Sequence, residues 1–163
     1  MVSLGHRFGK KILKWLLLFG LIASPISLLG RSYKNWVILF LLNSYVNFFI
    51  APILAKKKVL RYPVRFLPKY YKSSIIYDYC LCSLVTVWYC RLTNQDSFKQ
   101  LVLKVWLFSI PQALMERWLE RHTQLIKYSK GWNWIYSLLT ITSAKLVLRC
   151  FLIFLDRTDK KMS

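Results

Sequence analysis

Four polar side chains within or beside long apolar stretches are the first candidates for chemistry: Asn47, Asp78, Gln112 and Glu116. An ionisable side chain within a membrane span costs about 2.5–3.5 kcal/mol on insertion scales, so its presence needs a reason. At ~1.5 Å of rise per residue, Asp78 lies roughly 9 Å from one end of its apolar segment, a depth that Asn47 and Gln112 also reach. We therefore predict an intramembrane polar cluster of these three residues, with Glu116 at its mouth. Two interpretations stay open: interhelical hydrogen bonds that hold a bundle together, or a pocket for an ion or small ligand.

Four basic side chains also fall within apolar stretches: Lys14, Lys104, Lys145 and Arg149. All but Lys145 lie within one or two turns of a predicted helix end, so we expect their charged groups to extend to the lipid headgroups. Lys145 is deeper, about 20 Å along the helix axis from Trp132. This depth places Lys145 in the opposite half of the membrane from Asp78, and we do not expect these two residues to form an ion pair.

Residues 116–122 contain the densest group of titratable side chains. Glu116 and Glu120 share a helical face, and Arg117 is spaced to pair with Glu120. A metal site would need more ligands, but His6 is the only histidine besides His122, and no His-x-x-x-His or Glu-x-x-His spacing occurs. The sequence also has no nucleophile–base pair, Gly-rich phosphate loop or haem spacing, so we expect neither enzyme activity nor a cofactor.

The four cysteines are Cys80, Cys82, Cys90 and Cys150, and none forms a Cys-x-x-Cys motif. All lie in or at the edge of apolar segments, which favours small apolar packing residues. A disulfide between Cys90 and Cys150 stays open, because both would lie near the outer surface.

Long apolar segments that would position these side chains dominate the chain. Hydrophobic residues make up 56% of its 163 residues, against about 45–50% in soluble domains. Five segments approach the ~20 residues that cross a bilayer, which predicts an all-α polytopic membrane bundle of about five transmembrane helices in a single domain, residues 1–163. The expected helices are 12–29, uncleaved and kinked near Pro25, then 36–55, 73–90, 101–115 and 132–155. The fourth is the shortest and should continue as a polar helix through Arg121; were it re-entrant, the C-terminus would turn inward.

A basic loop, 56–72, separates the second and third segments. It has no acidic residue and seven basic ones: Lys56, Lys57, Lys58, Arg61, Arg65, Lys69 and Lys72. Short basic loops stay in the cytoplasm, and a topology with the N-terminus inside and the C-terminus outside puts twice as many Lys and Arg inside as outside. In a soluble protein the net charge of +19 would suggest nucleic acid. Here the charges flank apolar segments, so anionic lipid is the expected partner and nucleic acid is not.

Several short runs together resemble a known family. They are YPVRFLPK at 62–69, DY at 78–79, WLER at 118–121, LIKY at 125–128 and KGW at 130–132. In this order they resemble an uncharacterised family of small multi-pass membrane proteins from Bacillus, Clostridium and related Firmicutes, over roughly residues 35–155. The resemblance implies a bacterial plasma-membrane protein and brings no activity. His122, Lys104 and Lys145 are not features of that family.

These observations favour a non-enzymatic integral membrane protein whose basic cytoplasmic face contacts anionic lipid or an acidic partner. Each basic residue near an anionic surface contributes about 1 kcal/mol of attraction, although the same charges could serve orientation alone. The alternative is a small transporter or channel built around Asp78. It would act as a homo-oligomer or with another membrane protein, because five short helices enclose little volume.

Overall fold

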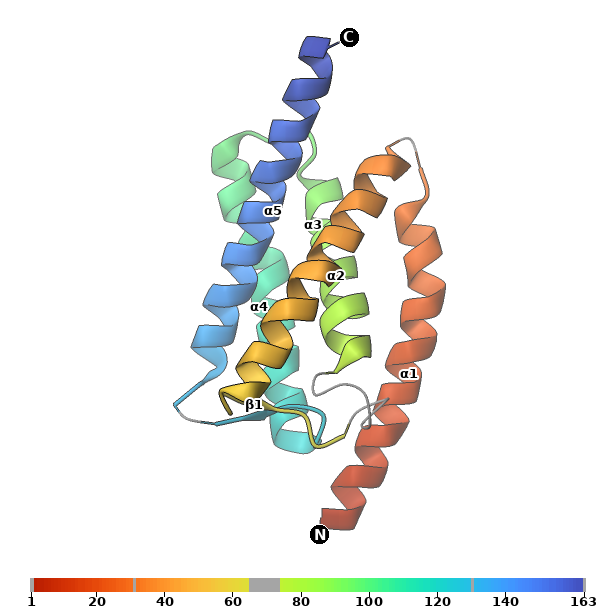
Figure 1. Cartoon of the computed structure of the whole chain (residues 1–163), viewed down its shortest axis with the longest axis vertical. Helices are drawn as coiled ribbons and strands as arrows, with labels where there is room; N and C mark the ends of the chain where they lie inside the picture. The colour runs from red at the N-terminus through yellow and green to blue at the C-terminus, as the bar shows by residue number, and fades with distance from the viewer. Residues whose placement is uncertain (1, 31, 65–73, 130, 163) are drawn as a thin grey trace.

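The computed structural model of the chain describes residues 2–30, 32–64, 74–129 and 131–162 (Figure 1). It confirms the all-α bundle. The helices are α1 Val2–Leu28, α2 Tyr33–Lys56, α3 Cys82–Leu92, α4 Phe98–His122 and α5 Trp134–Met162, and a π-helical segment, η1 Ile75–Leu81, leads directly into α3. Two short strands, β1 Leu60–Arg61 and β2 Lys127–Tyr128, complete the elements.

Two helices are much longer than predicted: α1 begins at Val2 instead of residue 12, and α5 continues to Met162 instead of ending at 155. The end of α4 at His122 agrees, to within one residue, with the predicted polar continuation through Arg121. Apolar runs mark the part of a helix that faces lipid, but the backbone hydrogen bonds of a helix continue into polar sequence until a capping or turn residue ends them. The extension of α5 matters most, because it moves Arg149 from near a helix end to the interior of the helix.

The helices run alternately up and down, so the two chain ends lie at opposite ends of the bundle (Figure 1). The connection after α2 and the connection after α4 meet at the end that carries the N-terminus. There β1 and β2 pair antiparallel, with Leu60 opposite Tyr128 and Arg61 opposite Lys127. The amide of Val64 also donates to the carbonyl of Gln124 at 2.9 Å. The sequence pattern did not predict this pairing, which joins the start of the basic loop to the segment before α5.

The outside of the bundle is apolar, and part of its inside is polar. Leu103 is 74% exposed and Trp15 is 71% exposed, whereas Lys145 and Arg149 are 1% and 2% exposed. Four helical segments are long and apolar enough to cross a membrane: Arg7–Leu28, Tyr33–Lys56, Ile75–Leu92 and Trp134–Thr158. This inverted distribution is typical of membrane proteins, since large exposed apolar surfaces need a cover other than water.

Close packing between α1 and η1 depends on one glycine. A Cβ atom at Gly20 would lie 2.7 Å from the Sγ of Cys80, well inside van der Waals contact. One turn further on, the hydroxyl of Ser24 lies 3.6 Å from the same sulfur. Small residues at a helix interface allow this kind of close approach in membrane proteins. All four cysteines are free, including Cys90 and Cys150, so the disulfide left open above does not form.

Candidate functional site

A cavity of about 120 Å³ lies within the bundle, walled by α2, η1–α3, α4 and α5. All four residues of the predicted polar cluster line it: Asn47 from α2, Asp78 from η1, Gln112 and Glu116 from α4. Residues that the sequence reasoning did not assign to the cluster line it too, namely Asn43, Tyr62, Cys82, Thr86, Trp132, Ser137 and Lys145 among others. The structure therefore brings the predicted cluster together and enlarges it.

Asp78 is buried and is held by three contacts. Its Oδ2 accepts a hydrogen bond from the backbone N–H of Ser74 at 3.1 Å, and its Oδ1 accepts one from the hydroxyl of Tyr62 at 3.4 Å. Its backbone carbonyl accepts a bond from Nδ2 of Asn47 at 2.7 Å, which ties η1 to α2. Burial, reinforced by the charges of Asp78 and Glu116, raises the pKa of Tyr62 well above its ordinary value of 10.0. The phenol therefore stays protonated and can donate to the carboxylate.

Glu116 belongs to a chain of hydrogen bonds at the N-terminal end of α5. The hydroxyl of Tyr128 donates to its Oε2 at 3.4 Å, and the hydroxyl of Ser137 donates to that of Tyr128 at 3.4 Å. The indole N–H of Trp132 donates to Ser137 at 3.0 Å. Burial also raises the pKa of Tyr128. Tyr128 and Trp132 lie in the short runs LIKY and KGW, but the sequence pattern did not predict these hydrogen bonds.

Lys145 joins this cavity, which the depth argument did not predict. Its Nζ donates to Oε1 of Gln112 at 2.6 Å, and the side chain is almost fully buried. The reason is the direction of helical side chains, which lean toward the N-terminus of their own helix. Since the N-terminus of α5 lies at the N-terminal end of the bundle (Figure 1), a lysine side chain on it extends toward Gln112. Among the described residues, the hydrogen-bond partner of Lys145 is the amide of Gln112, whereas the Asp78 side chain bonds to Ser74 and Tyr62.

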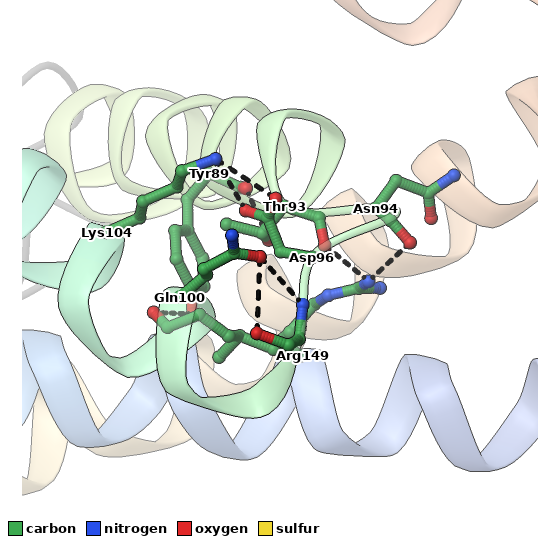
Figure 2. Close-up of polar contacts among 9 residues, drawn as sticks. Tyr89, Thr93, Asn94, Asp96, Gln100, Lys104 and Arg149 are labelled. Carbon is green, nitrogen blue, oxygen red and sulfur yellow. Dashed lines mark hydrogen bonds and ion pairs between the residues drawn. The ribbon is translucent and has the colours of Figure 1, made fainter.

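A second polar group (Figure 2) surrounds the connection between α3 and α4, which lies at the opposite end of the bundle (Figure 1). Lys104 forms an ion pair with Asp96 at 2.8 Å and is partly exposed. Arg149 is buried, and its Nη2 donates to the carbonyls of Thr93 at 2.8 Å and Asn94 at 3.0 Å. The prediction that Arg149 extends to the headgroups is therefore wrong, because α5 continues past it and its guanidinium turns into the α3–α4 connection.

The basic loop is described only in part. Lys56, Lys57, Lys58 and Arg61 are exposed at the N-terminal end of the bundle. Arg65, Lys69 and Lys72 lie outside the described residues. Other exposed cations gather at the same end, from α1 and from the end of α4: Lys10, Lys11, Lys14 and Arg121. The result is a concentration of positive charge from separate parts of the chain, within which the β1–β2 pairing sets Arg61 opposite Lys127.

The titratable segment 116–122 is divided by the fold. Glu116 faces the cavity, while the guanidinium of Arg117 lies 5.6 Å from the centre of the Trp134 ring. The ring of His122 stacks on Trp118 at the exposed side of α4. Within the described ranges no three His, Cys, Asp or Glu side chains come together as a metal site.

The chain was compared with protein-family models, curated proteins and solved structures, and it matches none of them. The resemblance to the Firmicutes membrane family therefore stays a prediction from short runs of sequence.

Proposed function

We propose that the protein is a non-enzymatic, multi-pass membrane protein that binds a small cation in the cavity around Asp78 and carries it across the bilayer. The observation that carries this proposal is the cavity itself, in which carboxyl groups from two different helical segments, Asp78 and Glu116, line one space with the amides of Asn47 and Gln112. Polar groups at membrane depth commonly mark an ion or substrate path.

The size and charge of the cavity favour a small cation. A cavity of 120 Å³ has room for several waters, or for one ion with part of its hydration shell. Two carboxyl groups line the cavity with only one ammonium, that of Lys145, so its acidic groups outnumber its basic one among the described residues. A carboxylate has about four acceptor positions, and the two hydrogen bonds to Asp78 leave it capacity for a ligand.

Flux in proteoliposomes tests the proposal directly, with sodium, potassium and ammonium as probes. Asp78→Asn and Glu116→Gln each replace a carboxyl group of the cavity with an amide that cannot ionise, and should reduce flux at least about tenfold, since a lost charged contact to the bound cation is worth roughly 1.5–3 kcal/mol. Glu120→Gln is the matched control, because it removes a carboxylate from the same helix outside the cavity. Full flux in Asp78→Asn would exclude Asp78 from the mechanism.

The basic N-terminal end supports a second candidate, contact with anionic lipid or an acidic partner. The observation that supports this candidate is the β1–β2 register, which sets Arg61 opposite Lys127, with Lys56–Lys58 exposed in the preceding residues. Replacing Lys56, Lys57 and Lys58 with Gln should reduce enrichment of phosphatidylglycerol over phosphatidylcholine in co-purified lipid. Unchanged enrichment in that variant would mean that these charges serve only to orient the chain in the membrane.

The membrane arrangement is also a proposal. We place the N-terminal end in the cytoplasm of a bacterial plasma membrane, following the positive charge of that end and the Firmicutes resemblance. In this arrangement α4 crosses the membrane with the other four spans. Supporting this, α4 runs between the same two ends as α3 and α5 (Figure 1), and its outer face is apolar, with Leu103, Leu107 and Ile110 exposed.

A further inference from the structure

A second and larger cavity lies at the opposite end of the bundle from the basic loop. Its volume is about 570 Å³, within the 300–1,000 Å³ typical of sites for organic ligands. It lies between the start of α4 and the outer half of α5. The lining residues are Asn94, Gln95, Asp96, Ser97, Phe98, Leu101, Arg149, Cys150, Ile153, Asp156 and Arg157.

Arg149 supplies unused hydrogen-bond donors in the wall of this cavity. Only 2% of the residue is exposed. Nη2 is occupied by the carbonyls of Thr93 and Asn94, as Figure 2 shows, whereas Nε and Nη1 have no hydrogen-bond partner in the described chain. A guanidinium always carries its charge, and leaving its buried donors unpaired is costly. The buried guanidinium of Arg149 therefore has two nitrogen donors, Nε and Nη1, that are free to bind a ligand.

Two carboxylates, Asp96 and Asp156, also line the cavity, and each has a hydrogen-bond or ion-pair partner outside its lining. Asp96 forms its ion pair with Lys104 at 2.8 Å, and Oδ1 of Asp156 accepts a bond from Nδ2 of Asn35 at 2.9 Å. A second guanidinium, the exposed Arg157, lines the same cavity.

The first turn of α4 adds further positive character. The Ser97 amide donates to the Gln100 side chain at 3.1 Å, which caps the helix. The remaining N–H groups of the first turn carry the positive end of the helix dipole. These features together select an anion.

We propose that this cavity binds a phosphate group, held by Arg149 and Arg157 against the N-terminal end of α4. Guanidinium groups suit phosphate because their donors match its oxygens in geometry and charge. Leu101, Ile153 and the exposed Phe98 line the same space, so the ligand has an apolar part beside its phosphate. A phospholipid headgroup has this chemistry, and a free phosphate or phosphomonoester shares the anionic part. This proposal is independent of the cation proposal, whose residues lie at the other cavity.

The test uses the full chain, delipidated in a phosphate-free non-ionic detergent. Inorganic phosphate is titrated in one arm and phosphatidylglycerol in the other, and native mass spectrometry measures the bound fraction. We expect saturable binding to the wild type and at least about tenfold weaker binding to Arg149→Gln, as for loss of a charged contact. Lys34→Gln, which removes an exposed cation that does not line the cavity, should bind as the wild type does.

The two arms identify the source of the phosphate. Binding of lipid alone assigns a headgroup, whereas binding of inorganic phosphate, with competition between the two, assigns a site for the phosphate itself. Arg157→Gln removes an exposed side chain and tests the site even where Arg149→Gln fails to fold; we expect several-fold weaker binding. Binding of neither probe to the wild type overturns the proposal. Wild-type affinity in both Arg157→Gln and a folded Arg149→Gln also overturns it.

Discussion

The contact between Lys145 and Gln112 predicts an unusual pattern of stability. Lys145 lies eleven residues beyond the first residue of α5, about 16 Å along the axis at ~1.5 Å per residue, and its ammonium donates to Gln112 at 2.6 Å. Gln112→Leu removes the only acceptor that the described residues give this ammonium and leaves a buried charge unpaired. Lys145→Met keeps the length of the side chain and removes the charge. The two substitutions should therefore have very different costs.

The magnitudes follow from what each variant leaves behind. Interhelical hydrogen bonds in membranes contribute about 0.6 kcal/mol on average and at most about 1.7, but an unpaired buried charge costs about 3–5 kcal/mol in soluble proteins. We expect Gln112→Leu to cost roughly 2–3 kcal/mol. The Cys82 contact of Gln112 is a weak sulfur bond and adds little. Lys145→Met leaves one amide oxygen without a donor and also removes a desolvated charge, so it should stay within about 1 kcal/mol of the wild type.

The double variant decides the argument. Without the Lys145 ammonium, Gln112→Leu no longer leaves a buried charge unpaired. The double variant Gln112→Leu with Lys145→Met should therefore recover at least about 1.5 kcal/mol of the stability that Gln112→Leu alone loses. Unfolding in mixed micelles of increasing SDS content, followed by the fluorescence of the seven tryptophans, measures all three variants. Costs that add to within about 0.5 kcal/mol would refute the reasoning, since they would mean that the ammonium has other partners.

Three further outcomes are expected. Tyr62→Phe should resist alkaline unfolding, followed by tryptophan fluorescence, better than the wild type does. Burial raises the pKa of the Tyr62 phenol well above its ordinary value of 10.0, so the stabilising effect of the neutral phenol is complete below that value and is lost as the pH rises further. Gly20→Val should lower the thermal midpoint by overpacking α1 against η1, at a cost of about 1–3 kcal/mol, and Cys80→Ala should restore part of it; a loss that Cys80→Ala leaves unchanged would contradict the contact. A cysteine introduced as Lys57→Cys in a cysteine-free background should resist an impermeant maleimide on intact cells; labelling there would reverse the proposed orientation.

The apolar pattern predicts the bundle well and its helix ends poorly. Each long apolar run became a helix, because a backbone in lipid must satisfy its own hydrogen bonds and the helix does this within one segment. The ends at Val2 and Met162 follow polar sequence with ordinary helix propensity, for which a hydropathy pattern has no signal. The β1–β2 pairing depends on two segments more than sixty residues apart, and neither has enough strand residues to reveal it alone.

The sequence likewise predicts some residues of the candidate site correctly and misplaces others. Depth arithmetic brought Asn47, Asp78 and Gln112 to one level because it needs only the rise per residue and the helix ends. It misplaced Lys145 because the arithmetic follows Cα positions, while a lysine side chain extends several ångströms toward the start of its helix. Arg149 was assigned to the headgroups for a related reason, since the true end of α5 lies thirteen residues beyond it.

The two interpretations of the polar cluster, structural hydrogen bonding and ligand binding, differ in what a conservative substitution does. The same contacts join the helices and line the cavity: Asn47 joins α2 to η1, and Gln112 joins α4 to α5. Stability alone cannot separate the interpretations, because both require these bonds. Glu116→Gln can, since the amide oxygen still accepts from Tyr128 while the charge is lost. If the cluster serves only to join helices, the variant should unfold and conduct as the wild type does; if the cavity binds a cation, its stability should hold and its flux should fall.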